Sequence, residues 1–323
     1  MPLIYYILVK RILKKQESDF MKSNVIKSNV SLLLAAAIWG LAFVAQSEGM
    51  DYIGPFTFGA ARCFLGVLFL IPVWLIISRK TYKDMPRAEV RKTIGKTFKV
   101  GCLCGAVLFV AISAQQIGLV YTTAGKAGFI TALYIVLVPV VSSFIFRRKA
   151  GIAVWISVAL ATVGLYLLCM PGGGFSVSKG DIYVLVCAAV FTGHILIVDR
   201  FADEVDGTLL SMVQFAVVAL LSVPFIFITG ETPSLEAISG AWVSIAYTGI
   251  LSCGVAYTLQ IVGQKHASNP TVASLLMSME SVFAAVFGWL ILNERLSAVE
   301  FIGALLMSGA IVLSQIKLPE KSK

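Results

Sequence analysis

Long apolar runs separated by short polar stretches follow one another along nearly the whole chain. Ten of these runs are close to the roughly 20 residues that a helix needs to cross a bilayer. They lie at about 30–48, 55–78, 100–118, 124–146, 152–170, 181–198, 208–229, 241–263, 270–292 and 298–316. Backbone amides cannot face lipid unpaired, so each run should be helical. The pattern predicts an all-α integral membrane protein with ten transmembrane helices.

Composition supports this class. The chain of 323 residues is 58% hydrophobic and 13% charged, whereas soluble domains carry about 25% charged residues. Its six cysteines all lie within apolar runs, which argues against a disulfide framework or a zinc site. We expect no metal and no cofactor.

Positive charge is distributed unevenly between the two ends of the expected bundle. If the amino terminus is cytoplasmic, 22 lysines and arginines lie on that side and 3 on the other. The positive-inside rule then places both termini in the cytoplasm. Residues 1–29 and 317–323 are read as cytoplasmic tails, and Met21 is an alternative start. The net charge of +9 is thus a topology signal and a contact with anionic lipid, so no nucleic-acid partner is expected.

The chain also contains a weak internal repeat. Residues 31–78 align with 183–230 at an offset of 152, and later spans align at offsets of 144 and 145. The matched pairs include Pro72 with Pro224, Gln116 with Gln260, and Gly164 with Gly309. The halves are 30–170 and 181–316, each with five expected spans. Because five is odd, the second half should be inverted, which is a transporter architecture.

Two motifs resemble a known family. "AAAIWGLAFVAQ" in the first span and "SLLMSMESVFAAVFGWLILNERLSAVEFIGALLMSGAIVL" near the end are similar to the opening and closing motifs of EamA-type transporters of the drug/metabolite transporter superfamily. The resemblance implies ten helices in two inverted five-helix halves, and export or exchange of small metabolites across the cytoplasmic (inner) membrane. It also implies a central cavity lined by spans one, three, four, six, eight and nine.

Three ionisable residues lie well inside the apolar runs, namely Arg62, His194 and Glu280. A charge at mid-bilayer costs about 2.5–3.5 kcal/mol, so each should face a cavity or a partner. Glu280 could bind a cationic substrate or a coupling proton. It could instead pair with Arg62 or cap a broken helix. For Arg62 we favour a structural role, and for His194 either hydrogen-bonded packing or contact with substrate or proton.

Helical spacing selects the remaining candidates for substrate binding. They are Trp39 and Phe43 in the first span, Gln116 in the third, Tyr134 in the fourth, and Tyr257 and Gln260 in the eighth. Aromatic and amide groups suit amphipathic organic molecules. The alternative is that they form hydrogen bonds between helices.

These features favour a secondary transporter that exports amino acids or related small metabolites by alternating access, with proton coupling as an option. Cationic drugs and nucleotide-sugar-type metabolites are alternative substrates. An intramembrane enzyme or a non-transporting scaffold is the alternative of another class, but no catalytic residues are assigned. Gly95-Lys96-Thr97 mimics the end of a phosphate loop, yet Val90 stands in place of its first glycine. ATP-driven pumping by this chain alone is therefore not expected.

Overall fold

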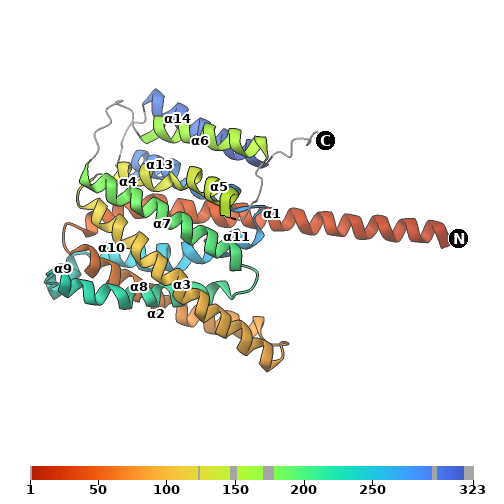
Figure 1. The fold of residues 1–323 in the computed structure, drawn as a ribbon, viewed down its shortest axis with the longest axis horizontal. Helices are drawn as coiled ribbons and strands as arrows, with labels where there is room; N and C mark the ends of the chain where they lie inside the picture. The colour runs from red at the N-terminus through yellow and green to blue at the C-terminus, as the bar shows by residue number, and fades with distance from the viewer. Residues whose placement is uncertain (1, 123, 146–150, 170–177, 293–296, 316–323) are drawn as a thin grey trace.

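The computed structural model describes residues 2–122, 124–145, 151–169, 178–292 and 297–315, and this part of the chain is almost entirely helical (Figure 1). The first half contains α1 (Pro2–Gly49), α2 (Pro55–Thr81), α3 (Arg87–Leu119), α4 (Ala124–Ala132), α5 (Tyr134–Ile145) and α6 (Ile152–Cys169). The second half contains α7 (Lys179–Phe201), α8 (Gly207–Ile228), α9 (Leu235–Gly240), α10 (Trp242–Ala246), the π-helical η1 (Tyr247–Ala256), α11 (Tyr257–His266), α12 (Pro270–Met277), α13 (Glu280–Leu292) and α14 (Ala298–Gln315). The prediction of an all-helical chain is confirmed for these residues.

Seven helical stretches of the described chain are long and apolar enough to cross a membrane. They are Asn24–Gly49, Pro55–Thr81, Arg87–Leu119, Ala127–Ile145, Lys179–Phe201, Gly207–Ile228 and Trp242–His266. Shorter apolar helices cover Ile152–Leu167, Pro270–Ala284 and Ala298–Ser314, where three further spans were predicted. One boundary differs clearly, because α1 already begins at Pro2, far ahead of the expected start at residue 30.

Helix starts are fixed by recognisable capping groups. Ser178 and Asp181 form a capping box at the start of α7, with mutual bonds of 3.1 and 2.7 Å. Asp206 accepts a hydrogen bond from the amide of Leu209 at 2.9 Å and so caps α8. Asn269 caps α12, which has Pro270 in its first turn. Such caps satisfy amides that have no partner within the helix.

Helices from the two halves pack against one another. In Figure 1, α6 and α14 form one edge of the bundle and α2 and α8 the opposite edge, with α1 running between them. Glycines allow close approach of these helices. A Cβ at Gly105 of α3 would lie 2.8 Å from the carbonyl oxygen of Gln214 in α8, and one at Gly249 of η1 would lie 2.8 Å from that of Arg62 in α2. Most close packing in the bundle therefore joins one half to the other.

Two of the expected spans are broken near their middle. Leu133 separates α4 from α5, and Ser278 and Met279 separate α12 from α13. At both breaks an amide bonds to the carbonyl three residues back, Leu133 to Ile130 at 3.2 Å and Met279 to Leu276 at 3.3 Å. This tightens the turn locally. As a result, Tyr134 and Glu280 each become the first residue of a new helix.

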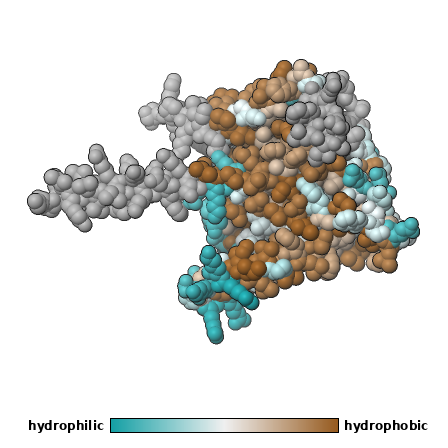
Figure 2. Space-filling model, turned by 180° about the vertical axis from the view of Figure 1, so that it is seen from behind, coloured by the Kyte–Doolittle hydropathy of each residue, from teal (hydrophilic) through white to brown (hydrophobic). Residues whose placement is uncertain are grey.

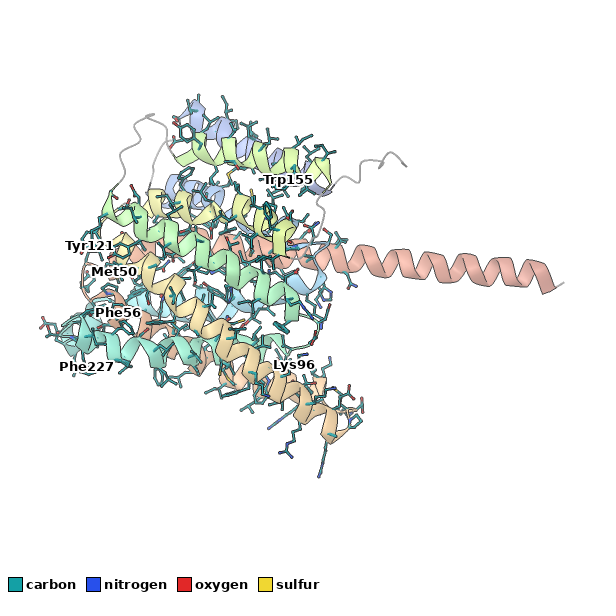
Figure 3. All side chains as sticks on the ribbon, in the orientation of Figure 1. Met50, Phe56, Lys96, Tyr121, Trp155 and Phe227 are labelled. Carbon is teal, nitrogen blue, oxygen red and sulfur yellow. The ribbon has the colours of Figure 1, made fainter. Side chains whose placement is uncertain are left out.

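The surface of the bundle has an apolar belt between two more polar ends. Figure 2 shows hydrophobic side chains over the middle and hydrophilic ones at both ends of the visible face. Exposed hydrophobic residues include Phe64 and Ile76 on α2 and Leu220 and Phe227 on α8. In Figure 3, Lys96 lies at one end of the bundle, whereas Met50, Tyr121 and Phe227 lie at the other. The end that carries Lys96 is called the Lys96 end below.

Candidate functional site

A cavity lies near the centre of the bundle, between helices of both halves. Its lining includes Trp39, Ala42, Phe43, Gln46, Arg62, Gln115, Thr131, Tyr134, Phe191, Ile195, Ser252, Tyr257, Gln260 and Glu280. It offers about 50 Å³ to the centres of water molecules. One water needs roughly 10–15 Å³ by this measure, so the cavity has room for only a few waters. A larger solute would require the helices to move apart.

Glu280 supplies the negative group of the cavity. Its side chain is buried, and its Oε1 accepts a hydrogen bond of 3.3 Å from the hydroxyl of Tyr134. Because Glu280 is the first residue of α13, it also lies at the positive end of that helix dipole. The break between α12 and α13 thus places a carboxylate where backbone amides partly offset the cost of burying it.

Arg62 supplies the positive group. Its Nη1 donates to Oε1 of Gln46 at 2.5 Å, and its guanidinium lies 5.5 Å from the ring centre of Phe58. Its buried Nε has no hydrogen-bond partner within the described part of the chain. Arg62 and Glu280 therefore line the same cavity but have different partners. Between these two described residues no ion pair forms, so the alternative of direct pairing is not realised in this structure.

Aromatic rings form another part of the wall. The rings of Trp39 and Tyr257 meet edge to face with 4.9 Å between centres. Tyr257 meets Phe215 in the same way at 5.0 Å. Phe43 also lines the cavity. Rigid rings next to a few charged and amide groups are typical of sites for small organic molecules.

The structure brings together most of the residues selected from the sequence. Lining the cavity are Trp39, Phe43, Arg62, Tyr134, Tyr257, Gln260 and Glu280. The other two selected residues, Gln116 and His194, are fully buried outside this lining. Nε2 of His194 lies 3.0 Å from Oε1 of Gln214, which fits the packing alternative for His194 in this conformation.

Helical spacing alone missed several lining residues. Gln115 lines the cavity in place of its neighbour Gln116, and its Nε2 donates to Oγ1 of Thr131 at 3.2 Å. Consecutive residues on a helix point about 100° apart, so a shift of one residue selects another face. Gln46 was also missed, although it follows Phe43 by three residues on the same helix face.

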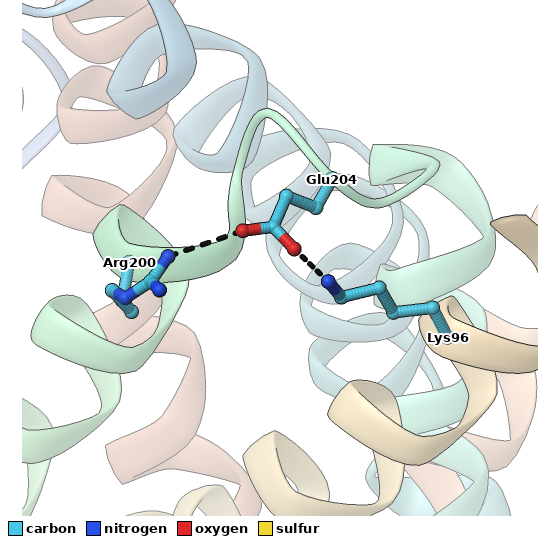
Figure 4. Close-up of polar contacts among 3 residues, drawn as sticks. All are labelled: Lys96, Arg200 and Glu204. Atoms are coloured by element: carbon cyan, nitrogen blue, oxygen red, sulfur yellow. Dashed lines mark hydrogen bonds and ion pairs between the residues drawn. The ribbon is translucent and has the colours of Figure 1, made fainter.

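Polar contacts join the two halves at the Lys96 end of the bundle. Glu204 pairs with both Lys96 and Arg200 (Figure 4), and its bond from Arg200 is 3.1 Å long. Nearby, Oδ2 of Asp206 accepts from the hydroxyl of Tyr82 at 2.7 Å and from Nε1 of Trp74 at 3.3 Å. The amide of Asp206 donates to Thr97 at 3.0 Å. We call Trp74, Tyr82, Thr97 and Asp206 the Asp206 cluster.

The opposite end has a comparable contact. Glu231, which follows α8, accepts hydrogen bonds from the amides of Phe56 at 3.0 Å and Thr57 at 2.8 Å. It also accepts one from the Thr57 hydroxyl at 2.6 Å. A carboxylate of the second half therefore caps α2 of the first half. Within the described residues, no group of three His, Cys, Asp or Glu side chains lies close enough to hold a metal ion.

Apolar helices around a buried polar cavity, with contacts between the halves at both ends, define a polytopic membrane protein of the transporter class. The family model described as the EamA-like transporter family matches residues 26–170 and 178–315. The chain belongs to this family, and it is a multi-pass membrane transporter. The resemblance found in its two motifs is thereby confirmed.

Relatives and a solved structure agree with this assignment. An uncharacterized transporter of Archaeoglobus fulgidus is 30% identical over 90% of this chain and 86% of its own length. A chloroplastic WAT1-related protein of Arabidopsis thaliana is 29% identical over 87% of this chain and 67% of its own length. The uncharacterized transporter YoaV of Bacillus subtilis is 26% identical over 90% of this chain and 97% of its own length. A crystal structure with 18% identity superposes with a TM-score of 0.72 over 89% of this chain and 96% of that one, which supports the fold alone.

Proposed function

We propose that the protein is a secondary transporter that exports amino acids or related small metabolites across the cytoplasmic membrane. The observation that carries the proposal is the presence of Arg62 and Glu280 in one buried cavity, each with a neutral hydrogen-bond partner. A zwitterion carries one carboxylate and one ammonium group. On binding, the substrate carboxylate would replace Gln46 as the partner of Arg62. The substrate ammonium group would replace Tyr134 as the partner of Glu280, so each charge in the cavity would have an opposite charge beside it.

The proposal includes ten spans arranged as two inverted halves. In its support, the family model matches the chain twice, over 26–170 and 178–315. In the proposed repeat, α7, α8 and the η1–α11 segment correspond to α1, α2 and α3. The contact of α3 with α7 then corresponds to that of α11 with α1, and the contact of α3 with α8 corresponds to that of η1 with α2. Rocking of one such half against the other would expose the cavity to each side in turn.

The proposed orientation places the Lys96 end and both termini in the cytoplasm. It rests on the excess of lysine and arginine in the segments at that end, including the turn between α2 and α3. Membrane lipid contacts the apolar belt of Figure 2.

Proton coupling through Glu280 is part of the same proposal. A buried carboxylate with a single side-chain partner can gain a proton or an ammonium ion, but not both at once. Competition between the two would couple an inward flow of protons to the export of substrate.

Transport by the purified protein in liposomes tests these points. Efflux and uptake of labelled amino acids are measured with and without a pH gradient for the wild type, Glu280→Gln and Glu236→Gln. Glu236 is an exposed acidic residue on α9 and serves as the matched control. We expect Glu280→Gln alone to lose the response to the gradient and to exchange amino acids more slowly, because a neutral amide pairs poorly with the substrate ammonium group. Transport of a cationic dye or a nucleotide sugar, but of no amino acid, would overturn the proposed substrate class.

A further inference from the structure

Five polar side chains are buried between α7, α8 and α11, on the side of the cavity toward the Lys96 end. This buried polar cluster consists of His194, Ser211, Gln214, Gln260 and Gln264, each at most 3% exposed. Within the described chain, every member has a buried polar atom without a hydrogen-bond partner. These atoms are Nδ1 of His194, Oγ of Ser211, Nε2 of Gln214, and Oε1 of Gln260 and Gln264.

Five of the nine buried side-chain polar atoms that lack a partner in the described chain belong to this cluster. Several other buried hydroxyls bond to a carbonyl of their own helix, as Thr192 does to Ala188 at 2.9 Å and Ser222 to Val218 at 2.8 Å. Outside the cluster, buried atoms of Arg62, Gln116 and Ser281 also lack partners within the described chain. Buried polar groups without partners are unfavourable, and a set of them in one place requires an explanation. A site whose partners arrive in another conformation provides one.

The buried polar cluster is continuous with the central cavity. Gln260 lines the cavity, and Gln264 follows one turn later on α11. Nε2 of Gln264 donates to the carbonyl of Ile195, itself a lining residue, at 3.0 Å. His194 precedes Ile195 and bonds to Gln214, and Ser211 lies one turn nearer the start of α8. From there the chain leads to Asp206, so the polar side chains form a row from the cavity toward the Asp206 cluster.

The internal repeat relates this row to residues that already line the cavity. At the offset of 152, His194 corresponds to Ala42 and Gln214 to Arg62. Both Ala42 and Arg62 are lining residues in this structure. If each half takes up the conformation of the other during transport, His194 and Gln214 line the open cavity in the second conformation. Ala42 and Arg62 are then buried.

We propose that His194, Ser211, Gln214 and Gln264 form the wall of the substrate path between the cavity and the Lys96 end. This inference rests on the proposed transport function and names the residues that serve its second conformation. The path closes where the Asp206 cluster joins α8 to α2 and α3. Its wall has imidazole, hydroxyl and amide groups instead of the Arg62 guanidinium. It therefore suits polar molecules that it holds by neutral hydrogen bonds, and it should bind an anionic group more weakly than Arg62 does.

Cysteine accessibility tests the path without relying on transport. All six native cysteines are replaced by alanine, and single cysteines are introduced as Ser211→Cys, Gln264→Cys and, for the control, Val198→Cys. Val198 is fully buried on α7 in an apolar cluster with Cys104 and Leu210. A membrane-impermeant thiol reagent is added to vesicles whose orientation is established with Lys96→Cys. Thermal melting shows whether each variant is folded.

We expect Ser211→Cys and Gln264→Cys to react at least tenfold faster than Val198→Cys from the Lys96 side. Adding Asp206→Asn should accelerate both further, because it weakens the closure. Reaction as slow as that of Val198→Cys, with and without Asp206→Asn, would overturn the proposal, as would faster reaction from the opposite side. Transport by the wild type is measured separately. Labelling without amino-acid transport would support the path and reject the proposed substrate class. Amino-acid transport without labelling would support the substrate class and reject the path.

Discussion

The hydroxyl of Tyr134 donates a hydrogen bond of 3.3 Å to Oε1 of Glu280, 146 positions further along the chain. The two residues begin α5 and α13, directly after the breaks in the fourth and ninth spans. The contact therefore joins the two halves of the chain at the cavity, and it is made by the side chains that the helix breaks redirect.

Tyr134→Phe should lower the stability of the protein by about 1–3 kcal/mol, because it leaves the buried Glu280 carboxylate without this donor. The measurement is thermal unfolding in detergent at neutral pH. Tyr166→Phe is the matched control, since Tyr166 on α6 is 41% exposed. Equal melting temperatures for the two variants would show that the bond from Tyr134 does not stabilise the fold.

Gly40→Ala should destabilise the protein and disturb the position of Glu280. A Cβ at Gly40 would lie 2.7 Å from the carbonyl oxygen of Glu280 and 2.8 Å from the amide nitrogen of Ala284. Both contacts are with backbone, so α1 and α13 must separate, and overpacking of this kind costs about 1–3 kcal/mol. The comparison is with Gly309→Ala on α14, where an added Cβ meets nothing within 4 Å. A melting temperature for Gly40→Ala equal to or above that of Gly309→Ala contradicts the prediction.

Glu231→Gln should weaken the start of α2. An amide has one acceptor oxygen, whereas the carboxylate uses both oxygens to cap Phe56 and Thr57. The expected loss is about 0.5–2 kcal/mol, the range for a lost helix cap. Hydrogen exchange of the amides in the first turn of α2 should also become faster. Glu236→Gln, at an exposed position, should change neither quantity, and slow exchange in Glu231→Gln would show that the cap is dispensable.

Tyr82 should make stability sensitive to high pH. Burial raises the pKa of its phenol, and the hydrogen bond and charge of Asp206 raise that pKa further. The unfolded chain releases this proton at about pH 10. Above that value the folded state binds more protons than the unfolded state, so stability falls as pH rises toward the folded pKa. Chemical unfolding at pH 8 to 11 should show a smaller loss for Tyr82→Phe than for the wild type. An equal loss of stability with pH in Tyr82→Phe and the wild type would contradict the prediction.

The helical architecture and the region of the cavity could be predicted from sequence because both depend on local patterns. Apolar run length predicts a helix, and a lone carboxylate such as Glu280 in such a run indicates a polar interior. The partner of Glu280 could not be predicted, since Tyr134 approaches it only through packing of distant helices. The same limit explains why Gln116 was selected although its neighbour Gln115 lines the cavity. Which of two adjacent amides faces the cavity depends on the rotation of α3, and that rotation is fixed by contacts of Gly101 with Val213 and of Gly105 with Gln214.

The packing of α3 against α7 and α8 also has a consequence for how the chain is made. When α3 enters the membrane, the helices that will cover Gly101, Gly105 and Gly118 have not yet been synthesised. About a hundred residues separate the end of α3 from the end of α8, which takes on the order of 10 s at 5–20 residues per second. During that interval the first half presents small-residue grooves to lipid or to other nascent helices. Assembly of this protein is therefore a late event, and the first half made alone should be a substrate for membrane quality control.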